Sequence, residues 1–311
     1  MRQSTFSLQA SDQKPLFVYA FRPDEGRSVK AVLQIAHGMA EHAGRYERLS
    51  KALCDAGYAV FASDHRGHGK TCESDAELGF FASSGGWNRV LLDQEELSAK
   101  IRSEYPREPI VIFGHSMGAT MVETLIFRRP ELYAGIVLSG SSGKPNALAE
   151  AGRWIAKAEK KRLGEKGKSA LIQKLTFEAF NKPFEPARTP FEWLSRDEAE
   201  VDKYKNDSRC GFVCTVSLWV DLLDGLAEIA KPKNIAKIRK DVPMYIMAGT
   251  EDPVSEKTKF LRHLVEAYYE GGLNKLTVRY YEGARHELCN EINRNQIIAD
   301  LISWLDQNIG H

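Results

Sequence analysis

Short apolar, strand-like runs alternate with amphipathic, helix-like segments along most of the chain, and this alternation restricts the possible folds more than any other feature. Strands that alternate with helices favour a mostly parallel sheet that is covered on both faces. We therefore predict an α/β fold. The strand-like runs are 31–38, 58–64, 109–114, 134–140, 242–249 and 275–283, and helices are predicted over 44–57, 87–105, about 254–269 and about 290–308.

The middle of the chain, residues 143–216, interrupts this alternation. It contains four of the twelve prolines and no convincing buried strand, and residues 147–180 have apolar positions at helical spacing. We predict a helical cap here, inserted into a core domain made of residues 1–142 and 217–311. A cap on the ligand side of a sheet can form a gated apolar pocket. An insertion that only packs on the core is the alternative.

The composition excludes several classes of function. A net charge of +1 gives no reason to expect nucleic acid as a partner. The N-terminal segment lacks the apolar core of a signal peptide, and no apolar run is long enough to span a bilayer. Five cysteines without framework spacing indicate reduced thiols and a cytoplasmic location. Cys210 and Cys214 have no Cys or His cluster near them in the sequence, so we expect no metal site.

A serine stands between small residues where a strand becomes a helix. Residues 114–118 read Gly-His-Ser-Met-Gly and follow an apolar run directly. The glycines permit the close approaches of a strained strand-to-helix turn, and the new helix directs N–H groups and a positive dipole end toward Ser116. The sequence therefore predicts a nucleophile at Ser116, with a solvent-facing serine in a tight turn as the alternative. His115 adjoins it, so we expect its side chain to point away.

An acid and a histidine follow later strand-like runs. The ligand crevice of a parallel sheet lies beyond the carboxyl ends of its strands, which is where both residues fall. We predict that His286 is the general base of Ser116 and that Asp252 orients this base; Glu251 is the rival for the acid. The order serine, aspartate, histidine along the chain is that of an α/β-hydrolase.

A tetrahedral intermediate needs hydrogen-bond donors for its oxyanion. One donor is expected to be the backbone N–H of Met117, which directly follows the nucleophile. The other is expected from the loop after the strand 31–38, which makes the N–H of Met39 the candidate. Gly38 would let this loop bend close to a substrate.

Five motifs together resemble the monoacylglycerol lipase and lysophospholipase branch of the α/β-hydrolases. They are HGMAEHAGRY (37–46), DHRGHGK (64–70), GHSMG (114–118), AGTEDPVS (248–255) and YEGARHELCNE (281–291). The resemblance covers nearly all of the chain outside the cap. It implies a serine hydrolase that cleaves carboxylic esters, often monoacylglycerols, with a mobile helical cap over an acyl tunnel and no cofactor.

The resemblance assigns the same three catalytic residues and the same two oxyanion donors. It also implies that Glu41 and Arg45 contact the glycerol head of the substrate, although these residues are four apart and a local ion pair is an equal alternative. The family often has glycine where Ala40 stands. The cap contains no motif that aligns with the family, so an acyl-chain preference does not carry over, and general esterases belong to the same branch.

Two charged motifs have alternative interpretations. Asp64, Arg66 and His68 follow a strand, and we expect them to tie loops together rather than to act in catalysis. The basic cap segment 157–168 is expected to be a solvated helix face, with attraction of the cap to anionic lipid surfaces as the alternative.

Two other functions compete with ester hydrolysis. The same triad serves thioesterases, amidases and aminopeptidases, and an aminopeptidase would need an acid for the substrate amine, for which the cap offers Glu185 and Glu192. A non-catalytic ligand receptor on a hydrolase scaffold is the second alternative. The sequence leaves the acyl length, the head group and the oligomeric state open.

Overall fold

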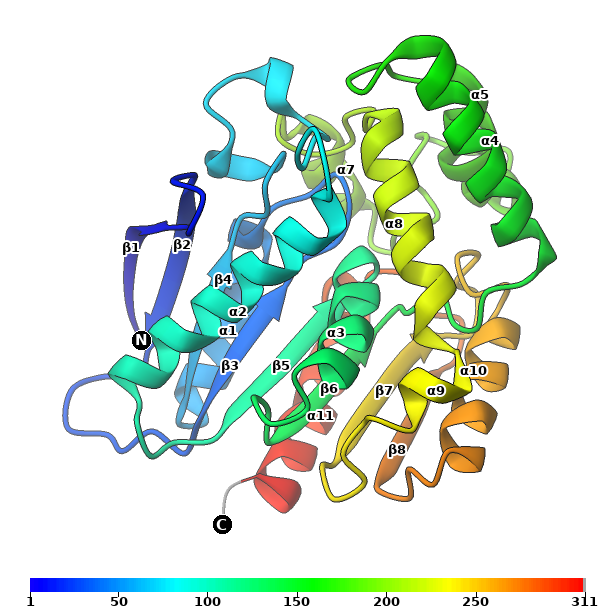
Figure 1. Cartoon of the computed structure of the whole chain (residues 1–311). Helices are drawn as coiled ribbons and strands as arrows, with labels where there is room; N and C mark the ends of the chain where they lie inside the picture. Colours follow the sequence, from blue (N-terminus) through cyan, green and yellow to red (C-terminus); the bar gives the residue numbers. More distant parts are fainter. Residues whose placement is uncertain (310–311) are drawn as a thin grey trace.

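The computed structural model describes residues 1–309 and contains one eight-stranded sheet (Figure 1). Strands β1, β2 and β4 pair antiparallel and all the other neighbours pair parallel, in the order β1-β2-β4-β3-β5-β6-β7-β8. The mostly parallel sheet confirms the predicted fold class. The strands are β1 Arg2–Gln9, β2 Pro15–Arg22, β3 Ala31–Ala36, β4 Tyr58–Ser63, β5 Ile110–His115, β6 Gly135–Ser139, β7 Met244–Gly249 and β8 Leu276–Tyr281.

The α-helices fall into two groups, those that follow the rhythm of the sheet and those between β6 and β7. The first group is α1 Glu47–Asp55, α2 Gly86–Glu104, α3 Met117–Arg128, α10 Lys259–Glu270 and α11 Arg294–Asn308. The second group is α4 Ala147–Leu163, α5 Ala170–Gln173, α6 Ala179–Asn181, α7 Glu198–Asn206, α8 Val216–Ile229 and α9 Pro232–Ile235.

Two apolar layers cover the sheet, one on each face. Helices α2, α3, α8 and α10 pack on one face, and α1 and α11 pack on the other. Strands β3 to β7 are buried along their whole length. A strand that is buried on both faces reads as a continuous apolar run, which is why the sequence identified these strands so readily.

Helices α4 to α7 lie beyond the carboxyl ends of the parallel strands, above the sheet in Figure 1. Helix α4 packs against α8, which continues down onto α3 and α2. The segment before α7 reaches the loop after β8 through two main-chain hydrogen bonds. In these, the N–H of His286 donates to Trp193 O at 3.4 Å and that of Glu287 donates to Leu194 O at 2.7 Å. The helical segment therefore contacts the loop after β8 at His286, the predicted general base.

Two predicted helices begin later than the sequence pattern indicated. The chain turns through three consecutive residues with positive φ, 256–258, before α10 begins at Lys259. Residues 288–290 form a 3₁₀ turn, and α11 begins only at Arg294. Tight turns carry no apolar periodicity, so the pattern placed both starts too early. Within residues 1–309, none of the helices combines the length and the apolar character that crossing a membrane requires.

Candidate active site

Ser116 occupies a strained turn between β5 and α3. Its φ of 54° and ψ of −116° lie outside the regions that L-residues favour. The flanking glycines are required sterically, because a Cβ atom at Gly118 would lie 2.0 Å from Ala36 O and one at Gly114 would lie 2.4 Å from Gly118 O. The N–H of Ser116 donates to Ser139 O at 3.0 Å, which fixes the turn against β6. The turn presents the serine at the carboxyl edge of the sheet.

His286 and Asp252 form a buried pair beside this turn. His286 Nδ1 lies 2.9 Å from Asp252 Oδ2, and the other carboxylate oxygen accepts the N–H of Val254 at 2.9 Å. Burial alone would lower the pKa of His286, but the charge of Asp252 and the shared hydrogen bond outweigh burial and raise it. Glu251, the rival acid, instead pairs with Lys257 at 2.6 Å near the surface.

A cavity of about 650 Å³ opens over Ser116 and His286, and Met39 and Met117 also border it. Apolar residues of α4, α8 and the segment from α5 to α7 form most of its wall, among them Ile155, Ile172, Phe177, Trp193 and Trp219. Within residues 1–309, no hydrogen bond joins Ser116 to His286. Such a bond often forms only when substrate is bound.

The N–H groups of Met39 and Met117 have no acceptor among the described residues. Both N–H groups are therefore available to a ligand in the cavity. The loop that carries Met39 bends at Ala40, whose φ of 54° lies in the left-handed region that favours glycine. Ala40 O accepts hydrogen bonds from Tyr204 Oη at 2.8 Å and from the N–H of Gly211 at 2.9 Å, and these bonds hold the loop in place.

Glu41 and Arg45 form an ion pair that extends to a third residue. Arg45 Nη1 lies 2.6 Å from Glu41 Oε2, and the guanidinium also binds Glu287 through two hydrogen bonds of 2.5 and 2.6 Å. Glu41 Oε1 accepts from the N–H of Gly38 at 2.5 Å and from Tyr46 Oη at 2.9 Å. Glu41 and Glu287 border the cavity, whereas Arg45 lies behind them. This ion pair ties the Met39 loop to the His286 loop.

His115 and Glu287 border the cavity, and the sequence analysis selected neither as a site residue. The ring of His115 lies 4.8 Å from that of His286. Burial and the neighbouring charge of His286 lower the pKa of His115, which keeps its ring neutral. Glu287 is the second residue. Each adjoins a predicted site residue in the sequence, and this adjacency is the only sequence signal for either.

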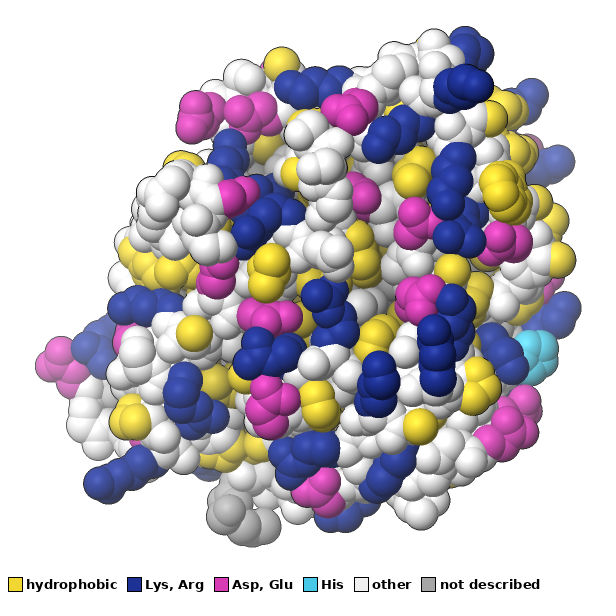
Figure 2. Space-filling view, viewed as in Figure 1, with side chains coloured by type: hydrophobic (Ala, Val, Ile, Leu, Met, Phe, Trp, Pro, Cys, Tyr) yellow, Lys and Arg dark blue, Asp and Glu magenta, His cyan; other side chains and the backbone are white. Residues whose placement is uncertain are grey.

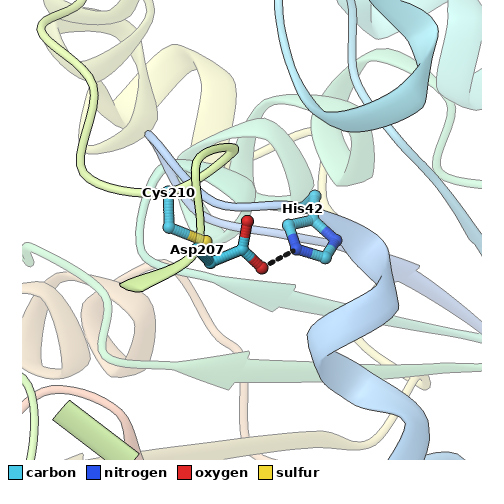
Figure 3. Close-up of side chains that lie close together, drawn as sticks. All are labelled: His42, Asp207 and Cys210. Carbon is cyan, nitrogen blue, oxygen red and sulfur yellow. Dashed lines mark hydrogen bonds and ion pairs between the residues drawn. The ribbon is translucent and has the colours of Figure 1, made fainter. Parts of the chain in front are cut away.

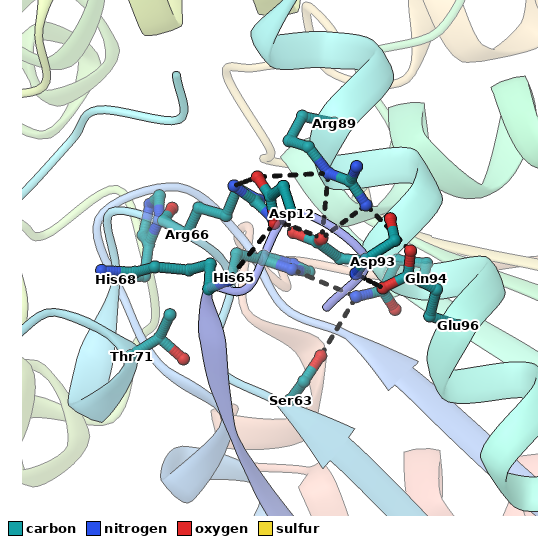
Figure 4. Close-up of polar contacts among 12 residues, drawn as sticks. Asp12, Ser63, His65, Arg66, His68, Thr71, Arg89, Asp93, Gln94 and Glu96 are labelled. Carbon is teal, nitrogen blue, oxygen red and sulfur yellow. Dashed lines mark hydrogen bonds and ion pairs between the residues drawn. The ribbon is translucent and has the colours of Figure 1, made fainter. Parts of the chain in front are cut away.

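The DHRGHGK motif (64–70) takes part in a separate network of ion pairs and hydrogen bonds (Figure 4). Arg66 binds Asp93 through bonds of 2.5 and 2.8 Å and Asp12 through bonds of 2.7 and 2.8 Å. Asp64 accepts the N–H groups of Ala43 and Lys70. These residues therefore tie loops together, as the sequence analysis expected. Burial lowers the pKa of His65 to about 3 and that of His68 to about 4, so both rings are neutral.

A mostly parallel sheet with a serine in a strained strand-to-helix turn, followed by an acid and a histidine after later strands, defines an α/β-hydrolase. The family model described as serine aminopeptidase, S33, matches residues 27–293. The match spans most of the chain, so the protein belongs to this family. The resemblance that the sequence motifs indicated is thereby confirmed.

Curated relatives and solved structures agree with this membership. The chain is 28% identical to monoglyceride lipase from Mus musculus, over 97% of this chain and 90% of the relative. It is also 28% identical to monoacylglycerol lipase from Mycolicibacterium smegmatis, over 89% and 88% of the two chains. A thermostable carboxyl esterase from Bacillus coagulans matches with a TM-score of 0.89 and 24% identity over 99% of each chain, which shows a shared fold.

Proposed function

We propose that this protein hydrolyses carboxylic esters through an acyl-enzyme, with monoacylglycerols or similar single-chain lipid esters as its substrates. The observation that carries the proposal is the strained Ser116 turn, which opens beside the His286–Asp252 pair into a large and mainly apolar cavity. The relatives named as monoglyceride or monoacylglycerol lipases support the same substrate class.

The proposed reaction uses the geometry directly. His286 accepts the proton of Ser116 Oγ while this oxygen attacks the ester carbonyl, and Asp252 stabilises the imidazolium that forms. The backbone N–H groups of Met39 and Met117 donate to the oxyanion, and each donor contributes about 3 kcal/mol to the transition state. His286 then protonates the departing alcohol. Water attacks the acyl-enzyme while His286 accepts its proton, and His286 returns that proton to Ser116 Oγ as the fatty acid leaves. No cofactor takes part in these steps.

Residues 143–216 are proposed to act as a cap that selects the acyl chain. Ile155, Ile172 and Phe177 come from this segment and border the cavity, so the acyl chain would lie mainly against cap side chains. Apolar surface of this kind favours a long alkyl chain by about 0.8 kcal/mol for each methylene that becomes buried. The glycerol head would lie on the side of Glu41, with Arg45 holding Glu41 in position.

The aminopeptidase alternative requires a carboxylate that is free to bind a substrate amine. Among the described residues, the acids that border the cavity are Glu41, Glu287 and Glu256. Arg45 pairs with both Glu41 and Glu287, so neither carboxylate is free of a cationic partner, and Glu256 pairs with Lys259 at 3.3 Å. Glu192 accepts a hydrogen bond from Thr189 Oγ1 and lies outside the cavity wall. These pairings favour an uncharged ester over an amine as the ligand.

The outer face of the cap is proposed to touch lipid surfaces transiently. Trp154 is 66% exposed, and Leu171 and Leu175 are each about half exposed. Lys and Arg side chains gather on the same face in Figure 2, around the region where Figure 1 places α4 and α5. Exposed apolar side chains among cations bind interfaces between water and anionic lipid. All five cysteines are free thiols, which fits the proposed cytoplasmic location.

A hydrolysis panel tests the proposal. The purified protein is given monoacylglycerols of increasing chain length, a lysophospholipid, an aryl ester and an aminoacyl amide, with Ser116→Ala as the blank. We expect turnover to rise with acyl length and the variant to lose all ester turnover while it keeps its fold. Retained turnover in Ser116→Ala would refute the role of this serine, and turnover of the amide alone would favour an aminopeptidase.

A fluorophosphonate probe separates a catalyst from a receptor. The probe reacts with serine hydroxyls that a general base activates, so we expect labelling at Ser116 in the wild-type protein and none in Ser116→Ala. A folded wild-type protein that is not labelled would fit a ligand receptor on a hydrolase scaffold and would contradict the proposed activity.

A further inference from the structure

Three side chains with different metal-binding atoms meet between the Met39 loop and the segment that follows α7 (Figure 3). They are His42, Asp207 and Cys210, whose nitrogen, oxygen and sulfur atoms all lie within 4.8 Å of one another. His42 Nε2 is 3.0 Å from Asp207 Oδ2, across a separation of 165 residues in the chain. This trio lies outside the serine–histidine–aspartate site and takes no part in the proposed reaction.

The local backbone brings the two ligand atoms after α7 together. The N–H of Cys210 donates to Asp207 O at 3.0 Å, which closes a turn between the two residues. Asp207 Oδ1 accepts the N–H of Arg209 at 2.8 Å, so the carboxylate is fixed with its other oxygen directed at His42. The carboxylate is thereby held in the position that a bound cation needs.

The surroundings allow a cation to enter and to be neutralised. His42 and Asp207 border an open surface groove, while Cys210 is almost completely buried behind them. Arg45 also borders this groove, and its guanidinium is already bound by Glu41 and Glu287. An ionised Asp207 and a Cys210 thiolate would together balance a divalent charge. Water from the groove would complete a tetrahedral set.

We propose that His42, Asp207 and Cys210 form a site for a zinc-like divalent cation. The mixture of imidazole, carboxylate and thiolate is the set that Zn²⁺ accepts. On binding, the ring proton of His42 moves to Nδ1 through solvent so that the neutral Nε2 can ligate, and the Cys210 thiol releases its proton to solvent as the metal–sulfur bond forms. The sequence analysis expected no metal at Cys210 because it considered only neighbours along the chain.

A cation at this site would link the cap to the oxyanion loop. His42 follows the loop that carries Met39, and Asp207 and Cys210 follow α7. The neighbouring residues Tyr204 and Gly211 already donate hydrogen bonds to Ala40 O. A metal bridge would add a stronger connection at the same place, so metal binding is expected to stabilise the fold and to hold the Met39 loop in position.

Cobalt binding tests the site without reference to enzymatic activity. The whole protein, kept reduced with a phosphine, is titrated with Co²⁺ alone while the absorbance is recorded. We expect one equivalent to bind with a thiolate-to-cobalt charge-transfer band, and Zn²⁺ to displace it. Zn²⁺ alone is expected to raise the unfolding temperature. Absence of the band in the wild-type protein would overturn the proposal.

Matched cysteine variants locate the sulfur ligand. Cys210→Ser is close to isosteric and should lose the charge-transfer band and bind Zn²⁺ at least about 100-fold more weakly. Cys214→Ser alters a second buried cysteine four residues away and should keep both properties. Asp207→Asn keeps the side-chain size and should weaken Zn²⁺ binding without abolishing the band. A band that persists in Cys210→Ser, or is lost in a folded Cys214→Ser, would refute the site.

Discussion

Ser116, the proposed nucleophile, has a strained backbone conformation. Ser116 has a positive φ without being glycine, which costs of order 1–3 kcal/mol. The surrounding structure maintains this conformation through the close crossing of α3 over β3 at Gly118 and through the hydrogen bond to Ser139 O. The strain holds the hydroxyl at the edge of the cavity, where a regular strand or helix would not place it.

Asp252 supplies a charge to His286 as well as a hydrogen bond. In Asp252→Asn the charge is lost while burial persists, so the pKa of His286 falls and the acid limb of the kcat/KM profile moves to lower pH. We expect kcat to fall about 10³–10⁴-fold. Steady-state rates between pH 5 and 9 measure both effects. Glu251→Gln is the matched control and should keep the wild-type profile, since Glu251 contacts Lys257 rather than His286. Similar losses in both variants would contradict the assignment.

Glu123 makes folding stability depend on pH. Its carboxyl is fully buried in α3, where burial raises its pKa to about 8 despite the hydrogen bond from Ser141 Oγ. The raised folded-state pKa contributes stability that is complete below about pH 4.5 and is lost as pH rises through 8. Glu123→Gln has no charge to bury. As the pH rises from 5 to 9, its unfolding temperature should therefore increase by several degrees relative to that of the wild type.

Calorimetry at pH 5 and at pH 9 measures the unfolding temperatures of the wild type and of Glu123→Gln. Glu270→Gln changes an exposed glutamate of α10 and should follow the wild-type protein at both. Parallel pH profiles for wild type and Glu123→Gln would show that Glu123 does not titrate in this range.

The position of a residue in the fold could be predicted from the sequence where that residue follows a clear strand. Ser116, Asp252 and His286 all stand at the carboxyl ends of runs that are strands in the structure, so their meeting at one edge follows from parallel topology. The roles of His115, Glu287 and His42 depend instead on the directions of side chains and on contacts between distant segments. Neither is encoded in periodicity or in spacing along the chain.

At the scale of elements, the strands and helices of the core were more predictable from the sequence than the region from α4 to α7. Buried parallel strands produce continuous apolar runs, and the helix predicted over 87–105 matches α2 to within one residue at each end. Between α4 and α7 the chain forms short pieces, including a π-helical turn over 174–178 and two helices of three or four residues. Such pieces depend on contacts with α8 and the sheet rather than on local propensity, so their limits cannot be read from sequence.

The exposed apolar residues of the cap predict a measurable affinity for membranes. In the double variant Trp154→Ser with Leu171→Ser, binding to anionic lipid vesicles should fall tenfold or more, because each side chain contributes about 1.5–3 kcal/mol when buried. Neither residue borders the cavity, so turnover of a short, soluble ester should stay within about twofold of wild type. Vesicle co-sedimentation and a soluble-ester assay measure the two quantities.

Tyr269→Ser is the control for this experiment. Tyr269 is comparably exposed but belongs to α10 rather than to the cap, and its replacement should leave vesicle binding unchanged. Equal losses in the control and in the double variant would mean that the cap is not the surface that meets lipid.

Across the whole molecule, the parts of the proposed cap differ in how many hydrogen bonds join them to the core. Residues 193–194 bond directly to the main chain of residues 286–287, and Arg196 pairs with Glu291 at 2.8 Å. Residues 170–181 have no main-chain hydrogen bond to the core among the described residues, yet they supply part of the cavity wall. We therefore expect residues 193–194 to stay with the His286 loop, whereas residues 170–181 could open without breaking main-chain hydrogen bonds to the core.

Hydrogen exchange should separate these two parts. Backbone N–H groups in 170–181 should exchange fastest within the cap, since this segment is built from short helical pieces that open locally at low cost. Those of α7 should exchange more slowly, because the preceding segment is tied to the His286 loop. Attaching a long-chain fluorophosphonate to Ser116 should slow exchange in 170–181, as the alkyl chain packs against Ile172 and Phe177, whereas a methyl fluorophosphonate should change it little. Equal exchange in both parts, or equal protection by both probes, would mean that the cap moves as one rigid unit and does not close over the acyl chain.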